Sequence, residues 1–166
     1  MRTILIIGAG RSASSLIQYL LNKSVSEELH LIIGDLSLDL ATKKTNNHPN
    51  ATPIALDIFD ENQRRNAIQK ANIVISMLPA HLHIEVARDC VVYKKHLVTA
   101  SYISDAMQEL DEVAKANNLI FMNEIGLDPG IDHMSAMKVI DEIREQGGKM
   151  LLFESFCGGL VAPESD

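Results

Sequence analysis

The stretch from Ile4 to Ala13 constrains the fold of this chain more than any other part of the sequence. Four aliphatic residues at positions 4–7 run without a break, as they do in a strand that is buried on both faces. Gly8 and Gly10 follow, and a small residue, Ala13, stands three positions further on. Beyond this turn the apolar residues recur at helical spacing: Leu16, Ile17, Leu20 and Leu21. The stretch therefore predicts a strand, a tight turn and a helix.

A strand, turn and helix with this glycine spacing are typical of dinucleotide-binding sites. Gly8 permits a turn that a side chain would forbid, and Gly10 lacks a Cβ, so that a pyrophosphate can approach the backbone. Ala13 is small enough for the helix to lie close to the strand. The N–H groups at the helix start, together with Arg11 and Ser12, would donate to the phosphates. The alternative is a glycine-rich structural turn in another α/β protein.

Strand-like and helix-like segments alternate along the rest of the chain. Strands are expected at 3–7, 29–33, 52–56, 73–77, 96–99, 119–122 and 149–156. Helices are expected at 12–22, 60–70, 82–94, 104–116 and 131–145. This alternation predicts an α/β fold with a doubly wound, mostly parallel Rossmann-type sheet and helices on both of its faces.

Composition excludes several classes of protein. A length of 166 residues suits one domain, and a net charge of −7 argues against nucleic acid as a partner. No apolar run is long enough to span a membrane. The two cysteines, Cys90 and Cys157, form no CxxC pair, which favours a reducing, cytoplasmic compartment. We therefore expect a cytoplasmic enzyme domain that acts on a small molecule.

Polar or special residues follow several of the expected strands, where a sheet of this kind binds its ligands. Asp35 would accept hydrogen bonds from the ribose of adenosine and would repel the extra phosphate of NADP, which predicts NAD rather than NADP, or else it is an ordinary loop or helix-capping aspartate. Asp57 would lie near the adenine, or else in a surface turn. Leu78 and Pro79 would flank the nicotinamide ribose, or simply end a strand.

Other candidate residues have both a chemical and an ordinary interpretation. Asp128 stands in a Leu-Asp-Pro-Gly sequence, so it could be a turn aspartate, and Tyr102 could be a packing side chain. Cys157 could be a buried, unreactive thiol. His81 and His83 are two positions apart, hence on different helix faces, and lack further ligands. We expect no metal site.

Three segments carry a family resemblance: 100–102 (Ala-Ser-Tyr), 123–133 (Asn-Glu-Ile-Gly-Leu-Asp-Pro-Gly-Ile-Asp-His) and 157–160 (Cys-Gly-Gly-Leu). With them the chain resembles the N-terminal part of the glutamate-forming saccharopine dehydrogenases, or saccharopine reductases. The resemblance implies that NAD(P) oxidises saccharopine to glutamate and 2-aminoadipate 6-semialdehyde, a step of lysine metabolism. Saccharopine is then the expected substrate.

The resemblance also implies roles for individual residues. Ser101 and Tyr102 match positions near the substrate, and Asp128 and Cys157 match positions near the chemistry. Leu127, Asp128 and Pro129 match the cofactor side, and Ala100 and Ser101 at the end of a strand are also expected to bind the cofactor. Because an aspartate with a pKa near ~4 is a poor base for an amine near ~10, Asp128 is expected to orient the amine or to stabilise the cationic imine. Tyr102 or Cys157 would relay a proton.

Members of this family are much longer than 166 residues and continue into a large substrate domain. We therefore expect residues 1–166 to form the NAD(P)-binding domain alone, which would bind the cofactor but turn over poorly. Two other functions are open: a related amino-acid or polyamine dehydrogenase, and a non-catalytic nucleotide-sensing domain. An unpaired sheet edge could also lead to homo-oligomers.

Overall fold

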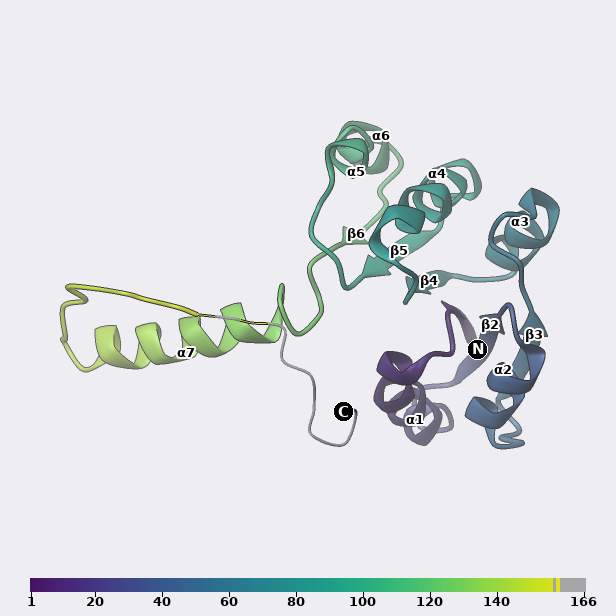
Figure 1. Ribbon diagram of the computed structural model, residues 1–166, viewed down its shortest axis with the longest axis horizontal. Coiled ribbons are helices and arrows are strands. Elements are labelled where there is room, and N and C mark those ends of the chain that lie inside the picture. The colour runs from purple at the N-terminus through teal and green to yellow at the C-terminus, as the bar shows by residue number, and fades with distance from the viewer. Residues whose placement is uncertain (157, 159–166) are drawn as a thin grey trace.

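The computed structural model describes residues 1–156 and 158 (Figure 1). Its strands are β1 (Arg2–Ile7), β2 (Leu29–Asp35), β3 (Ala51–Ala55), β4 (Ile73–Ser76), β5 (His96–Thr99) and β6 (Phe121–Met122). Its α-helices are α1 (Ser14–Lys23), α2 (Leu38–Thr45), α3 (Glu61–Gln69), α4 (His83–Tyr93), α5 (Asp105–Gln108), α6 (Asp111–Ala116) and α7 (Ile131–Glu145). Short 3-10 turns, η1 (Arg11–Ala13) and η2 (Ala80–Leu82), precede α1 and α4.

Within the described residues, six parallel strands form one sheet in the order β3-β2-β1-β4-β5-β6. The order reverses between β1 and β4, where open sheets of this kind bind their ligands. All strands run in the same direction, so their carboxyl ends meet at one edge. The predicted doubly wound Rossmann-type sheet is therefore confirmed.

The central strand β1 divides the core into two layers. Its side chains alternate, with Ile4 and Ile6 packed in one cluster and Leu5 and Ile7 in the other. The first cluster includes residues of α1 and α2, and the second includes residues of α3 and α4. Helices on both faces explain why four consecutive aliphatic residues are buried here.

The structure differs from the sequence-based expectations in three elements. Helix α2 was not expected, although Ser37 caps it by accepting a hydrogen bond from the Leu40 N–H. The single helix expected at 104–116 is divided into α5 and α6. The strand expected at 149–156 is wrong, because these residues form no strand and instead run back along α7 (Figure 1). Because α7 leads the chain away from the sheet, the segment 149–156 has no strand beside it with which to pair.

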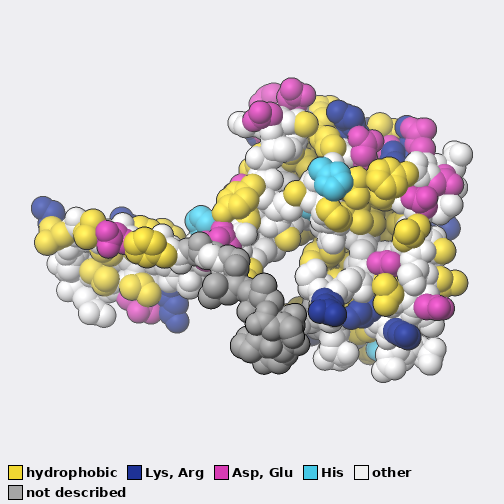
Figure 2. Space-filling view, in the orientation of Figure 1, with side chains coloured by type: hydrophobic (Ala, Val, Ile, Leu, Met, Phe, Trp, Pro, Cys, Tyr) yellow, Lys and Arg dark blue, Asp and Glu magenta, His cyan; other side chains and the backbone are white. Residues whose placement is uncertain are grey.

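Helix α7 and the segment 149–156 form an arm that extends away from the sheet (Figure 1). None of the residues in α7 is buried. Apolar side chains cover much of the arm in Figure 2, and they include Ile131, Met134, Met137, Val139 and Ile143. Among the described residues, no helix combines the length and apolar character that crossing a bilayer requires.

Candidate functional site

The two glycines of the first turn differ in what the fold demands of them. Gly8 has φ +104°, and a Cβ added there would lie 3.0 Å from the Met77 carbonyl oxygen. Gly10 has φ −64°, and a Cβ added there would meet no atom within 4 Å. The backbone therefore requires glycine at position 8 but not at position 10.

The turn presents backbone donors at the carboxyl end of β1. The N–H groups of Gly10, Arg11 and Ser12 donate to no acceptor within the described part of the chain. Ala13 is fully buried against the sheet and brings the start of the helix close to the strand. Free N–H groups at a helix start form an anion site, so the turn fits the pyrophosphate of a dinucleotide.

Asp35 connects the end of β2 to this turn. Its Oδ2 accepts a hydrogen bond from the Ala9 N–H at 2.7 Å, and its Oδ1 accepts one from the Ser37 N–H at 2.9 Å. Both carboxylate oxygens therefore stabilise loop backbone, in addition to any contact with a ligand. These contacts are those of a loop aspartate, the alternative that the sequence left open for this residue.

A cavity of about 310 Å³ lies beside Asp35 at the carboxyl ends of the strands. Gly8, Asp57 and Leu78 also line it, so the structure brings four of the predicted residues together. The Asp57 Oδ1 accepts the Phe59 N–H at 2.9 Å, which is the surface-turn role considered for this residue. Pro79 is exposed and begins the turn η2 next to the cavity.

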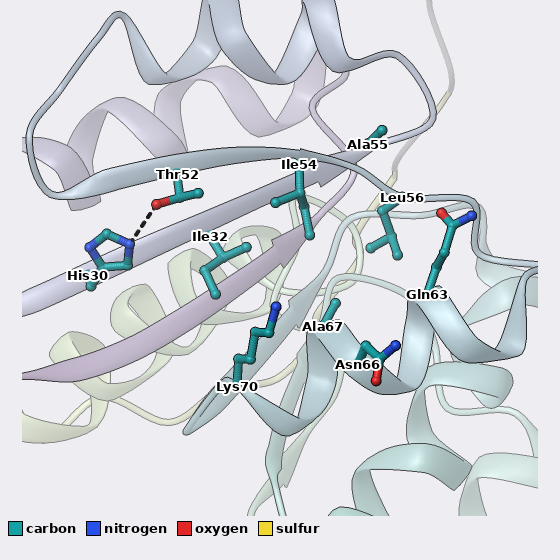
Figure 3. A pocket seen from close by; sticks show the side chains of 10 residues that line it. All are labelled: His30, Ile32, Thr52, Ile54, Ala55, Leu56, Gln63, Asn66, Ala67 and Lys70. Carbon is teal, nitrogen blue, oxygen red and sulfur yellow. Dashed lines mark hydrogen bonds between the residues drawn. The ribbon is translucent and has the colours of Figure 1, made fainter.

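A larger cavity of about 470 Å³ extends along β2 and β3 and reaches the carboxyl end of β3 at Ala55 and Leu56 (Figure 3). It is on the flank of the sheet, between β2, β3 and α3. Ile32, Ile54 and Ala67 form apolar lining, and the His30 Nε2 and the Thr52 Oγ1 are 2.9 Å apart at one end. None of the predicted site residues lines it, so we place the site at the smaller cavity.

Lys44 is a site residue that sequence reasoning missed. It lies in the last turn of α2, and its Nζ donates a hydrogen bond to the Ser14 Oγ at the start of α1. Its ammonium group is therefore beside the helix start that presents the free N–H groups. The helix that carries Lys44 was not expected, and so the sequence offered no reason to place this charge near the glycine turn.

A second group of predicted residues meets where β5 and β6 end. The Tyr102 hydroxyl donates a hydrogen bond to the Asp128 Oδ1 at 2.5 Å. The Ile103 N–H donates to the Glu124 Oε1 at 3.1 Å, and the Thr99 Oγ1 donates to the Asn123 Oδ1 at 2.9 Å. These bonds join the loop after β5 to the loop after β6, and they hold Tyr102 and Asp128 together.

The loop around Asp128 is shaped by close backbone packing. A Cβ added to Gly126 would lie 2.7 Å from the carbonyl oxygen of Ala100, which places Ala100 against this loop. The Gly126 N–H donates to the Pro129 carbonyl at 2.8 Å, across a cis Asp128–Pro129 bond. Pro129 is buried, whereas the Leu127 side chain is 74% exposed and contributes to the loop through its backbone.

His83 is the second residue that sequence reasoning missed. It is buried at the start of α4, and its Nδ1 is 2.8 Å from the Ser76 Oγ while its Nε2 is 2.9 Å from the Ser101 Oγ. Burial, with a smaller contribution from His81, lowers the pKa of His83 below its usual value. The sequence signal was a histidine in a first helical turn after a strand that ends in serine.

The structure describes Cys90 but not Cys157. Cys90 is buried in α4, and burial raises the pKa of its thiol to about 12, so it is not a reactive group. Cys157, which was expected near the chemistry, lies outside the described residues.

Comparison with known proteins identifies the family. Residues 4–122 match the saccharopine dehydrogenase NADP binding domain, and residues 126–166 match the saccharopine dehydrogenase C-terminal domain. Saccharopine dehydrogenase [NADP(+), L-glutamate-forming] of Pyricularia oryzae is 39% identical over 164 residues, and that of Schizosaccharomyces pombe is 40% identical over 164 residues. Each match covers 99% of this chain and 36% of the relative, so the chain spans about a third of their length.

Solved structures agree. The apo saccharopine dehydrogenase (L-Glu forming) of Saccharomyces cerevisiae superposes with a TM-score of 0.76 and 32% identity, over 89% of this chain and 32% of that chain. The 3-ketoreductase KijD10 of Actinomadura kijaniata, in complex with NADP, has a TM-score of 0.64 at 18% identity, over 87% of this chain and 44% of that chain. The second likeness is one of fold alone.

These matches contradict the expected preference for NAD. The matching domain is described as NADP binding, and the fungal relatives are named for NADP(+). The prediction rested on Asp35 as a ribose ligand that repels the extra phosphate, whereas the backbone N–H groups of Ala9 and Ser37 donate to its two oxygens and offset part of its negative charge at the turn. With matches of this extent in sequence and in fold, the chain belongs to the saccharopine dehydrogenase family.

Proposed function

We propose that this chain supplies the NADP-binding part of an L-glutamate-forming saccharopine dehydrogenase. The observation that carries the proposal is the turn at residues 8–13, whose free N–H groups lie beside Asp35 and a cavity at the switch point of the sheet. Gly10, Arg11 and Ser12 would hold the pyrophosphate. Asp57 and Leu78 would flank the nucleotide, and Pro79 would shape the adjoining turn.

Tyr102 and Asp128 would assist the oxidation of saccharopine. When bound, NADP supplies the oxidant for the carbon–nitrogen bond of saccharopine. The Asp128 carboxylate is positioned by the Tyr102 hydroxyl, and we assign it the role of orienting the neutral secondary amine or of stabilising the cationic imine that forms when hydride leaves. Tyr102 would pass on a proton, and Ala100, Leu127 and Pro129 would form the cofactor side of this loop pair.

Residues 1–166 by themselves would bind NADP and oxidise saccharopine slowly, because relatives named for this activity are about three times as long. That residues 1–166 form one cofactor-binding domain stays a prediction, as does the role of Cys157 in proton transfer. The cysteine content favours a cytoplasmic location.

The test is calorimetric titration of NADP+ and NAD+ into the chain. We expect NADP+ to bind more tightly than NAD+, since the ammonium group of Lys44 adds a positive charge at the turn. Lys44→Ala should weaken NADP+ binding about tenfold, because a charge-assisted hydrogen bond contributes about 1.5 kcal/mol. Lys43→Ala is the matched control, since that lysine is exposed and adjacent, and it should bind NADP+ like the parent chain. Failure of the parent chain to bind either dinucleotide would refute the proposal.

A further inference from the structure

A buried hydrogen-bonded bridge connects the ends of two strands next to the site. Ser76 ends β4 and is fully buried, and His83 at the start of α4 is 4% exposed. The His83 Nδ1 is 2.8 Å from the Ser76 Oγ, and its Nε2 is 2.9 Å from the Ser101 Oγ after β5. Ser101 is half-buried and directly precedes Tyr102, whose hydroxyl holds Asp128. The bridge therefore runs from the core to the predicted reaction centre.

The direction of these hydrogen bonds follows from the Ser76 proton. Within the described residues, the Ser76 hydroxyl has no acceptor other than the His83 Nδ1. A buried hydroxyl that donates to nothing is costly, so Ser76 donates and Nδ1 accepts. A neutral imidazole has one acceptor and one donor nitrogen, so Nε2 carries the proton and donates it to the Ser101 Oγ.

We propose that His83 is a positioning residue that fixes the Ser101 hydroxyl as a hydrogen-bond donor toward the site. Because the Ser101 Oγ already accepts from His83, its own proton is directed to another acceptor, and no described side chain or backbone group takes it. The half-buried Ser101 hydroxyl is therefore available to donate to a carbonyl or carboxylate oxygen of a ligand. The carboxamide of nicotinamide and a carboxylate of an amino-acid substrate share this chemistry. The identity of the ligand rests on the proposed function, but the hydrogen-bond direction does not.

The hydrogen-bond direction has a direct spectroscopic test. In ¹⁵N-labelled chain at neutral pH, long-range ¹H–¹⁵N correlation spectra should show His83 with an unprotonated Nδ1 and a protonated Nε2. Ser76→Ala removes the donor to Nδ1 and should allow the other tautomer to appear. An imidazole protonated at Nδ1 in the parent chain would overturn the proposal, whether or not the chain binds NADP.

The ligand side is tested with a pair of substitutions at position 83. His83→Leu removes the donor to Ser101, whereas His83→Gln keeps an N–H group at the Nε2 position. Binding of NADP+, of 2′-phospho-ADP-ribose (which lacks nicotinamide) and of saccharopine is measured for each. His81→Leu is the matched control, because His81 is exposed and two residues away.

We expect His83→Leu and Ser101→Ala each to bind the ligand that contacts Ser101 about tenfold more weakly than the parent chain does. His83→Gln should restore the affinity of the parent chain. Weaker binding of NADP+ with unchanged binding of 2′-phospho-ADP-ribose identifies the carboxamide of nicotinamide as the acceptor. A loss for saccharopine alone identifies the substrate carboxylate. Unchanged binding of both ligands in folded His83→Leu would overturn the proposal, while unchanged binding of the fragment shows that the nucleotide site is intact.

Discussion

At the residue scale, Gly8 and Gly10 belong to one motif but serve two different purposes. Gly8 holds a left-handed backbone that is packed against the Met77 carbonyl, so the fold itself requires it. Gly10 has an ordinary backbone and open space where a Cβ would project. The motif therefore combines a folding requirement with a binding requirement, and the two can be separated by substitution.

Gly8→Ala should lower the free energy of unfolding by about 1–3 kcal/mol, because alanine is strained at φ +104° and meets the Met77 oxygen. Gly10→Ala should unfold like the parent chain but bind NADP+ at least tenfold more weakly, since its methyl group would occupy the approach to the free N–H groups. Urea unfolding and calorimetry measure the two effects. Equal stability of the two variants would contradict this separation.

His83 gives the chain a pH dependence whose sign is fixed by burial. Its pKa is lowered in the folded chain, so the unfolded chain takes up more protons as the pH falls below about 6.5. The stabilising contribution is therefore complete above that pH and is lost as the pH falls through the folded pKa. Urea unfolding across this range should show a decline of up to about 1.4 kcal/mol per pH unit. His83→Gln, which does not titrate, should show a shallower decline; an unchanged slope would be inconsistent with this role.

Sequence reasoning at this scale found the residues whose backbone or position is distinctive. Gly8, Asp35 and Asp57 were identified because glycine spacing and strand ends are readable from the order of residues. The two residues it missed, Lys44 and His83, reach the site from helices. Their roles depend on which neighbour lies across a turn, and a linear pattern does not contain that information.

At the scale of elements, α3 and α4 are held together by buried charges. The Arg64 Nε donates to the Asp89 Oδ2 at 2.7 Å, and the Arg64 Nη1 donates to the Ile58 carbonyl at 2.6 Å. Arg65 donates to the other oxygen of Asp89 at 3.1 Å, and this bond raises the pKa of Arg65. Asp89 and Arg64 are both buried, so each depends on the other for its solvation.

Asp89→Asn should lower the free energy of unfolding by about 3 kcal/mol, because the buried Arg64 charge loses its partner. Glu61→Gln is the control, since it removes only the exposed ion pair between Glu61 and Arg65 and should cost less than about 1 kcal/mol. Thermal and urea unfolding measure both. Similar losses in the two variants would show that the buried pair contributes no more than the exposed one.

Strands were easier to predict than helices for a physical reason. A parallel strand covered on both faces is a run of aliphatic residues, and β1, β2 and β4 were found on that basis. Helix α2 buries only Ala41 and Thr45 and is otherwise polar, so it leaves little apolar pattern. The segment 149–156 is apolar enough to suggest a strand, but no sheet edge lies beside it in the structure.

At the scale of the whole molecule, the sheet and the arm have opposite surface characters. The sheet is covered by helices, whereas α7 is exposed along its length and carries apolar residues on nearly every side. A helix of this composition is normally buried in a core. The match of residues 126–166 to the C-terminal domain of the family agrees with a separate role for the arm.

The exposed arm should cause this chain to self-associate. Sedimentation velocity should show an average mass that rises with protein concentration, because Met134 and Val139 are each more than half exposed on α7. Met134→Glu combined with Val139→Glu should reduce the association. Lys138→Gln, on the same helix, is the control and should behave like the parent chain. A constant monomer mass at all concentrations would refute this prediction.

Asp128 occupies the joint between the sheet and the arm, within the loop that leads from β6 to α7. The Tyr102–Asp128 hydrogen bond therefore links the loop after β5 to the loop that leads into α7. We therefore expect a partner molecule bound to α7 to change how the Tyr102 hydroxyl and the Asp128 carboxylate are aligned with each other.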